Sequence, residues 1–265
     1  MAVIYSKGTG LPLVVIPGIQ GRWEWMLPAL RALERHCQTI SYSLCGDFAA
    51  GWKRDRSHGF DNYLRQLDEV LDHAGLKRVA LCGISYGGFI ALRYAATRPE
   101  RVSHLVLTSA PSPQWKPNQV QSRYISKPWI STPAFIATAP QRLWPEICAA
   151  YDSLSSRLAF CATHALRVIT APAIPSMMAA RIVEQQSMDF TGDCAAINCR
   201  TLVVTGEPHL DAIVPVEATC EYLSLIPNAK YAVIERTGHL GLLTRADTFA
   251  SVVSSFISDA DNHRP

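Results

Sequence analysis

Short apolar runs alternate with helical patterns along most of this chain. The runs carry almost no polar residues, which is typical of strands buried on both faces of a sheet. They lie at residues 13–16, 79–82, 105–107, 202–204 and 231–234. Helical patterns lie at residues 27–36, 63–73, 89–97, 216–225 and 248–257. This alternation predicts an α/β fold, in which a mostly parallel, twisted sheet is flanked by helices.

The alternation stops between residues 111 and 199. This segment lacks a clear strand pattern and holds nine of the seventeen prolines. We interpret it as a helical lid (cap) inserted into a core made of residues 1–110 and 200–265. Its large apolar side chains either pack the insertion onto the core or line a substrate pocket beneath it. The pocket candidates in this segment are Trp129, Trp144 and Met178.

Charge and composition exclude several classes of protein. Hydrophobic residues make up 48% of the 265 residues, which indicates a globular chain with a core. The formal net charge is only +3, and no basic stripe with stacking aromatics is present, so nucleic acid is not an expected partner. No apolar run reaches the roughly 18 residues of a membrane-spanning helix. The first residues also lack the pattern of a secretory signal.

Eight cysteines are spread along the chain. A chain of this size does not need disulfides to fold, so we expect reduced thiols and a cytoplasmic location. Cys194 and Cys199 lack the partners of a structural zinc site, and no metal is expected. The expected partner is a small-molecule substrate, with the protein acting as a monomer or homodimer.

The strongest chemical signal directly follows the strand pattern at residues 79–82. Gly83-Ile84-Ser85-Tyr86-Gly87 matches GxSxG between a strand and a helix, the context in which this motif presents a nucleophile. The glycines permit a turn too tight for larger side chains, while the serine hydroxyl stands clear of the sheet. Ser85 is therefore the predicted nucleophile.

A serine hydroxyl needs a base to remove its proton at neutral pH, and histidine is suited to that role. Of the eight histidines, His239 lies directly after the last predicted strand and before the last helix. That position places it at the carboxyl edge of the sheet, where Ser85 is also expected.

A carboxylate is needed to orient the histidine and to stabilise its positive charge. Glu207 and Asp211 both follow the strand pattern at residues 202–204. We favour Asp211, which comes shortly before the helix at residues 216–225, and interpret Glu207 as a loop carboxylate or a pocket neighbour.

With these residues in place, the chain resembles an α/β-hydrolase-fold serine hydrolase with a lid, in the order Ser85, Asp211, His239. The resemblance covers nearly the whole chain. The matching pieces are Pro17-Gly18, Cys45-Gly46-Asp47, residues 83–88, 98–102 and 211–215, and Gly238-His239.

The resemblance implies a cofactor-free enzyme with an oxyanion hole made of backbone N–H groups. These groups belong to Tyr86, which follows the nucleophile, and to Ile19, in the loop after the first long strand. Gln20 and Trp23, from that same loop region, either face the pocket or pack locally.

The expected reaction is hydrolysis of a carboxylic ester, or a related acyl bond, of a small and largely apolar substrate through an acyl-serine. Members of the family that the chain resembles also cleave carbon–carbon bonds, lactones, amides or thioesters. Ser85, Asp211 and His239 alone do not distinguish between these reactions. A lyase, an acyltransferase, a cofactor-free oxygenation or a hydrolase-like small-molecule receptor stays open as an alternative.

Overall fold

The computed structural model describes residues 4–48 and 50–259, so residues 1–3, 49 and 260–265 of the predicted core lie outside the described residues. A seven-stranded sheet has the order β1-β3-β2-β4-β5-β6-β7. Every neighbouring pair is parallel except β1 with β3. The strands are β1 (Ile4–Lys7), β2 (Pro12–Ile16), β3 (Gln38–Tyr42), β4 (Val79–Ile84), β5 (Val102–Thr108), β6 (Arg200–Thr205) and β7 (Lys230–Val233). The predicted α/β fold with a mostly parallel sheet is confirmed.

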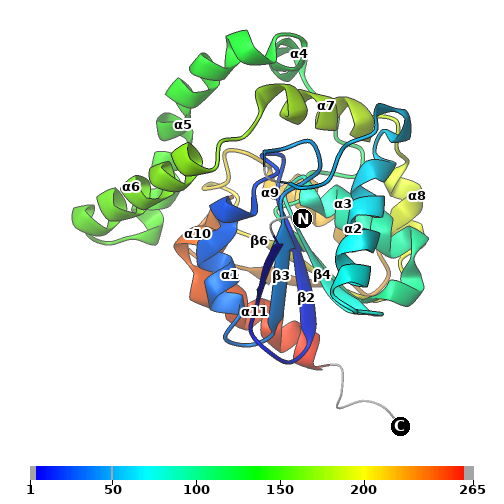
Figure 1. Ribbon diagram of the computed structural model, residues 1–265. Coiled ribbons are helices and arrows are strands. Elements are labelled where there is room, and N and C mark those ends of the chain that lie inside the picture. Colours follow the sequence, from blue (N-terminus) through cyan, green and yellow to red (C-terminus); the bar gives the residue numbers. More distant parts are fainter. Residues whose placement is uncertain (1–3, 49, 260–265) are drawn as a thin grey trace.

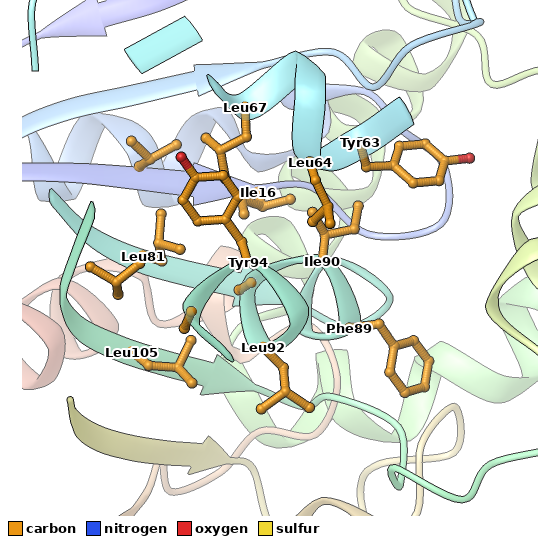
Figure 2. Packing of buried hydrophobic residues seen from close by; sticks show 14 of the residues in the cluster. Ile16, Tyr63, Leu64, Leu67, Leu81, Phe89, Ile90, Leu92, Tyr94 and Leu105 are labelled. Carbon is orange, nitrogen blue, oxygen red and sulfur yellow. The ribbon is translucent and has the colours of Figure 1, made fainter. Parts of the chain in front are cut away.

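Helices cover both faces of the sheet (Figure 1). One face packs against α1 (Leu27–Leu33), α10 (Gly241–Thr244) and α11 (Ala246–Ser258). The other packs against α2 (Asp61–His73), α3 (Gly87–Thr97), α8 (Phe190–Ala195) and α9 (Val216–Leu225). Figure 2 shows this second core, where α3 side chains such as Ile90 lie among Leu64 of α2 and Leu81 of β4. The short 3₁₀ turns are η1 (Trp23–Met26), η2 (Arg56–His58) and η3 (Pro99–Arg101).

Three strands differ from the sequence-based prediction. β1 and β3 were not predicted, and β3 carries polar residues that conceal its burial. Among them, Ser41 is fully buried because its hydroxyl donates a hydrogen bond to the carbonyl of Val15, at 2.7 Å. β7 was predicted to be buried on both faces, and this was wrong. It is the last strand in the sheet order, and Tyr231 and Val233 are exposed there.

Five helices and no strand lie between β5 and β6: α4 (Gln119–Ser126), α5 (Pro128–Ala150), α6 (Leu154–Thr170), α7 (Pro175–Gln185) and α8. In Figure 1, α5 stands away from the sheet. In contrast, α8 packs with the main body, where the ring of Phe190 stacks on Phe89 of α3 with centroids 4.4 Å apart. The segment from α4 to α7 is called the helical insertion below.

Within the described part of the chain, no single helix is long and apolar enough to cross a membrane. Only α6 and α7 taken together reach that length and composition, and they meet at an angle of 86°. All eight cysteines lie in described segments, and each is a free thiol.

The helical insertion is tied to the body by a buried ion pair. Arg181 of α7 pairs with Asp47, in the loop after β3, and both side chains are fully buried. Burial raises the pKa of the Asp47 carboxyl, and the guanidinium opposes that rise. A buried charge that loses its partner is costly because no water replaces the lost contact.

We therefore expect Asp47→Ala to lower the free energy of unfolding by about 3–5 kcal/mol, measured by urea denaturation, because it leaves the Arg181 charge buried without a carboxylate partner. The matched control is Asp72→Ala, which removes an exposed partner of Arg101. Loss of such a surface pair costs no more than about 1 kcal/mol. Equal losses in the two variants would show that the buried pair does not hold the insertion.

Candidate active site

Ser85 occupies the turn between β4 and α3. Its backbone φ is +52°, a region that residues other than glycine rarely adopt. The turn is held by the Ser85 N–H, which donates to the carbonyl of Thr108 at 2.8 Å, and by the Gly88 N–H, which donates to the carbonyl of Ser85 at 2.8 Å. Ser85 is half-buried, whereas its neighbours from Leu81 to Ile90 are all buried. A strained residue presented in this way is typical of a functional site.

The turn fits because the residue after Tyr86 is glycine. A Cβ on Gly87 would lie 2.4 Å from the carbonyl oxygen of Ile16, at the end of β2. The start of α3 therefore packs directly on the backbone of the neighbouring strand. This close approach fixes Ser85 at the carboxyl edge of the sheet, as the GxSxG pattern predicts.

His239 and Asp211 lie together on the loops that follow β7 and β6. His239 Nδ1 is 3.3 Å from Asp211 Oδ2. The other oxygen, Oδ1, accepts the backbone N–H groups of Ile213 at 3.0 Å and Val214 at 2.9 Å. An ionised carboxylate only accepts hydrogen bonds, so Nδ1 is the donor and Nε2 is left free to accept a proton.

Close backbone contacts bring these two loops together. A Cβ on Gly238 would lie 2.3 Å from the carbonyl oxygen of Leu210. A Cβ on Gly206 would lie 2.3 Å from the carbonyl oxygen of Thr237. The Glu207 N–H also donates to that Thr237 carbonyl, at 2.7 Å. The histidine and aspartate loops therefore form one packed unit.

The second carboxylate candidate, Glu207, faces a different group. Its Oε1 accepts the backbone N–H of Arg236 at 2.6 Å, and its Oε2 lies 3.6 Å from the Nε2 atom of His209. It thus holds the turn before His239, whereas Asp211 contacts the imidazole itself.

The two backbone N–H groups expected to bind an oxyanion belong to Ile19 and Tyr86. Within the described residues, neither N–H has an intramolecular acceptor. The loop that carries Ile19 lies against Ser85, because a Cβ on Gly18 would be 3.5 Å from the Cβ of Ser85. Both groups are therefore available for a ligand beside Ser85.

Arg181 of the helical insertion touches both of these elements. Its Nη1 donates to the carbonyl of Ile19 at 2.8 Å, and its own carbonyl accepts the hydroxyl of Tyr86 at 3.0 Å. The residue thus links the insertion to the Ile19 loop and to the turn that carries Ser85.

A second charged residue of the insertion, Glu146 of α5, reaches the histidine loop. Its Oε1 accepts the N–H of Leu240 at 2.7 Å, and the side chain is buried. Burial raises the pKa of this carboxyl to about 7, although the N–H groups of Gly238 and Leu240 and the nearby His239 all lower it. The sequence analysis missed Glu146 and Arg181; charged residues within apolar helical stretches were the available signal.

The remaining pocket candidates lie in different surroundings. The Gln20 side chain folds back over Gly18. Its Oε1 atom is 2.9 Å from where a Cβ on Gly18 would lie, and so it lies near Ser85. Trp23 packs locally instead, with its ring 5.3 Å from that of Tyr5. The other three candidates belong to the insertion: Trp129 and Trp144 are exposed on α5, and Met178 is partly exposed on α7.

A family model described as the alpha/beta hydrolase fold matches residues 12–246. The chain belongs to the α/β-hydrolase fold family.

This α/β-hydrolase is similar to several named proteins. It is 27% identical over 251 residues to the "Putative carbamate hydrolase RutD" of Klebsiella pneumoniae (strain 342), a match covering 92% of this chain and 90% of that protein. It is 26% identical over 267 residues to the 2-hydroxymuconate semialdehyde hydrolase of Pseudomonas sp. (strain CF600), covering 97% and 90%. The fold matches the enol-lactonase of Burkholderia xenovorans LB400 with a TM-score of 0.77 at 19% identity, covering 97% and 96%.

Proposed function

We propose that this α/β-hydrolase cleaves a carboxylic ester, or a related acyl bond, of a small and largely apolar substrate through an acyl-serine. The observation that carries the proposal is the contact between His239 and Asp211, on loops at the same sheet edge as the strained turn of Ser85. A base with an orienting carboxylate at the same sheet edge as a serine hydroxyl is the arrangement that nucleophilic catalysis requires.

In the proposed mechanism, His239 Nε2 accepts the proton of the Ser85 hydroxyl as its oxygen attacks the carbonyl carbon. The negative charge that develops on the carbonyl oxygen is bound by the N–H groups of Ile19 and Tyr86. The imidazolium, stabilised by Asp211, then donates its proton to the leaving group. A water molecule, deprotonated by His239, then attacks the acyl-serine; the bond to the serine oxygen breaks, the acid leaves, and His239 returns the proton to Ser85.

We assign substrate selection to the helical insertion, acting as a lid over Ser85. Its helix α5 exposes large apolar side chains, including Trp129, Ile130 and Ile136. Apolar surface of this kind suits an apolar acyl group.

The free thiols of all eight cysteines support a reducing, cytoplasmic compartment.

Hydrolysis of a carbon–carbon bond by the same residues is the second candidate. It is favoured by the likeness to a hydrolase named for 2-hydroxymuconate semialdehyde, a compound that contains no ester bond. The carbamate named for the other relative supports the acyl reaction instead, because a carbamate carries a carbonyl with a leaving group.

We expect Ser85→Ala to lower kcat for p-nitrophenyl esters of two to eight carbons by about four to six orders of magnitude, because the nucleophile is lost. The matched control is Ser109→Ala. Ser109 also follows a strand and has a positive φ of +44°, and this variant should keep its rate within about tenfold. A Ser85→Ala enzyme as active as the control would rule out the acyl-serine and favour a lyase or another non-hydrolytic reaction.

The two carboxylates give a second test. Asp211→Asn should lower kcat by on the order of 10⁴-fold, because an amide there no longer holds the imidazole in the required tautomer. Glu207→Gln retains an oxygen to accept the Arg236 N–H, so its rate should stay within about tenfold of the wild type. The opposite result, measured with the same esters, would assign the orienting role to Glu207.

A further inference from the structure

The contact between Glu146 and the histidine loop joins the helical insertion to the catalytic base. Leu240, whose N–H the carboxylate accepts, is the residue directly after His239. Leu240 also packs on the hydrophobic cluster that contains Ile147, the next residue of α5. A displacement of this turn of α5 would therefore also displace the backbone of His239.

This turn is also where α5 is anchored. The structure describes every residue of α5, and only Glu146, Ile147 and Ala150 are buried. The preceding residue, Pro145, is the third proline inside the helix. The rest of α5 extends away from the sheet in Figure 1. The contact with Leu240 is thus made by the small part of α5 that is fixed to the body.

A second contact lies one turn further along. The guanidinium of Arg236 donates to the carbonyl of Ala149 at 2.7 Å and also pairs with the carboxylate of Asp152. Asp152 is largely exposed, whereas Glu146 is buried. The two acidic residues therefore make comparable links between the same segments in different surroundings, which makes Asp152 a matched control.

The charged groups around Glu146 act in opposite directions. His239 favours the ionised carboxylate, and Asp211, from the loop after β6, disfavours it. An ion pair on the insertion side, between Arg236 and Asp152, is satisfied internally. Among residues 4–48 and 50–259, Glu146 forms no ion pair with a lysine or an arginine, and its carboxyl is held by backbone N–H groups on either side of His239.

We propose that Glu146 is a positioning residue that, when ionised, holds the histidine loop and couples the seating of the helical insertion to the alignment of His239. This inference rests on the proposed function, since it gives His239 the role of base. The ionised carboxylate accepts the loop N–H groups more strongly than a neutral carboxyl does. It also stabilises the imidazolium that forms when Ser85 loses its proton.

The pKa of about 7 places this ionisation in the neutral range. Above pH 7 the loop N–H groups should therefore be bound by a charged acceptor, at a cost to the stability of the fold because that charge is buried. A group that acts only through packing would have no such dependence.

The first test is kcat/KM for p-nitrophenyl acetate from pH 5.5 to pH 8.5 in Glu146→Gln, a variant of nearly the same shape. At pH 8 we expect about a tenfold loss relative to the wild type, carried by kcat, because a charged acceptor has been replaced by a neutral one. At pH 5.5, where the wild-type carboxyl is itself protonated, the two enzymes should agree within about twofold. Asp152→Asn should stay within about threefold at every pH.

Two results would overturn the proposal. One is a loss in Glu146→Gln that is absent or the same at all pH values, which indicates either no role or a purely structural one. The other is a pH-dependent loss in Asp152→Asn equal to that in Glu146→Gln, which would assign the coupling to Arg236.

The melting temperature gives a readout that does not depend on catalysis. The folded state keeps the Glu146 proton up to about pH 7, whereas an unfolded chain releases it near the ordinary value of 4.5. Stability from this group is therefore complete below pH 4.5 and is lost as the pH rises through 7. Glu146→Gln has no ionisable group at this position and therefore loses no stability in this way. Its melting temperature relative to the wild type should thus rise by several degrees from pH 5 to pH 8.

A constant difference in melting temperature would contradict ionisation of Glu146 in this range. The same ester assays with Ser85→Ala distinguish failure of the proposed function from failure of the positioning role. If Ser85→Ala remains active, the proposed function fails, whatever Glu146 does. If Ser85→Ala is inactive and Glu146→Gln shows no pH-dependent loss, only the positioning role fails.

Discussion

The close backbone contact between the start of α3 and the end of β2 is the constraint on which the site depends. Only glycine at position 87 allows it, because a Cβ would lie 2.4 Å from the Ile16 carbonyl oxygen. This contact forces the tight turn in which Ser85 adopts a positive φ, and it sets that residue beside the Ile19 loop. A parallel sheet then brings the loops after β6 and β7 to the same edge, and with them Asp211 and His239.

The helical insertion is bound to this edge of the sheet through polar side chains. It contributes two buried charged side chains, and each one reaches a different half of the site. Arg181 contacts the carbonyl of Ile19, and Glu146 contacts the N–H after His239. Buried charges are costly unless they are satisfied, so their positions restrict where the insertion can sit. The insertion therefore belongs to the structure of the site as well as to its surface.

The sequence predicted the parts whose signals are local. GxSxG between strand and helix placed Ser85, and the spacing after the last two strands placed His239 and favoured Asp211 over Glu207. β3 was missed because it carries buried polar side chains, and one of them, Ser41, is satisfied by Val15 of the neighbouring strand. Arg181 and Glu146 were missed for the same reason: their partners lie more than 90 residues away in the chain, and no periodicity reports such contacts. β7 has the composition of a buried strand but occupies an edge, which only the strand order reveals.

The most direct test of the central claim is covalent labelling of the purified protein with a fluorophosphonate, followed by peptide mass analysis. The account predicts one adduct, on the hydroxyl of Ser85, with labelling lost when Asp211 is replaced by asparagine. An adduct on a different serine, or no adduct on a protein that is folded by circular dichroism, would contradict an activated acyl-serine at this position.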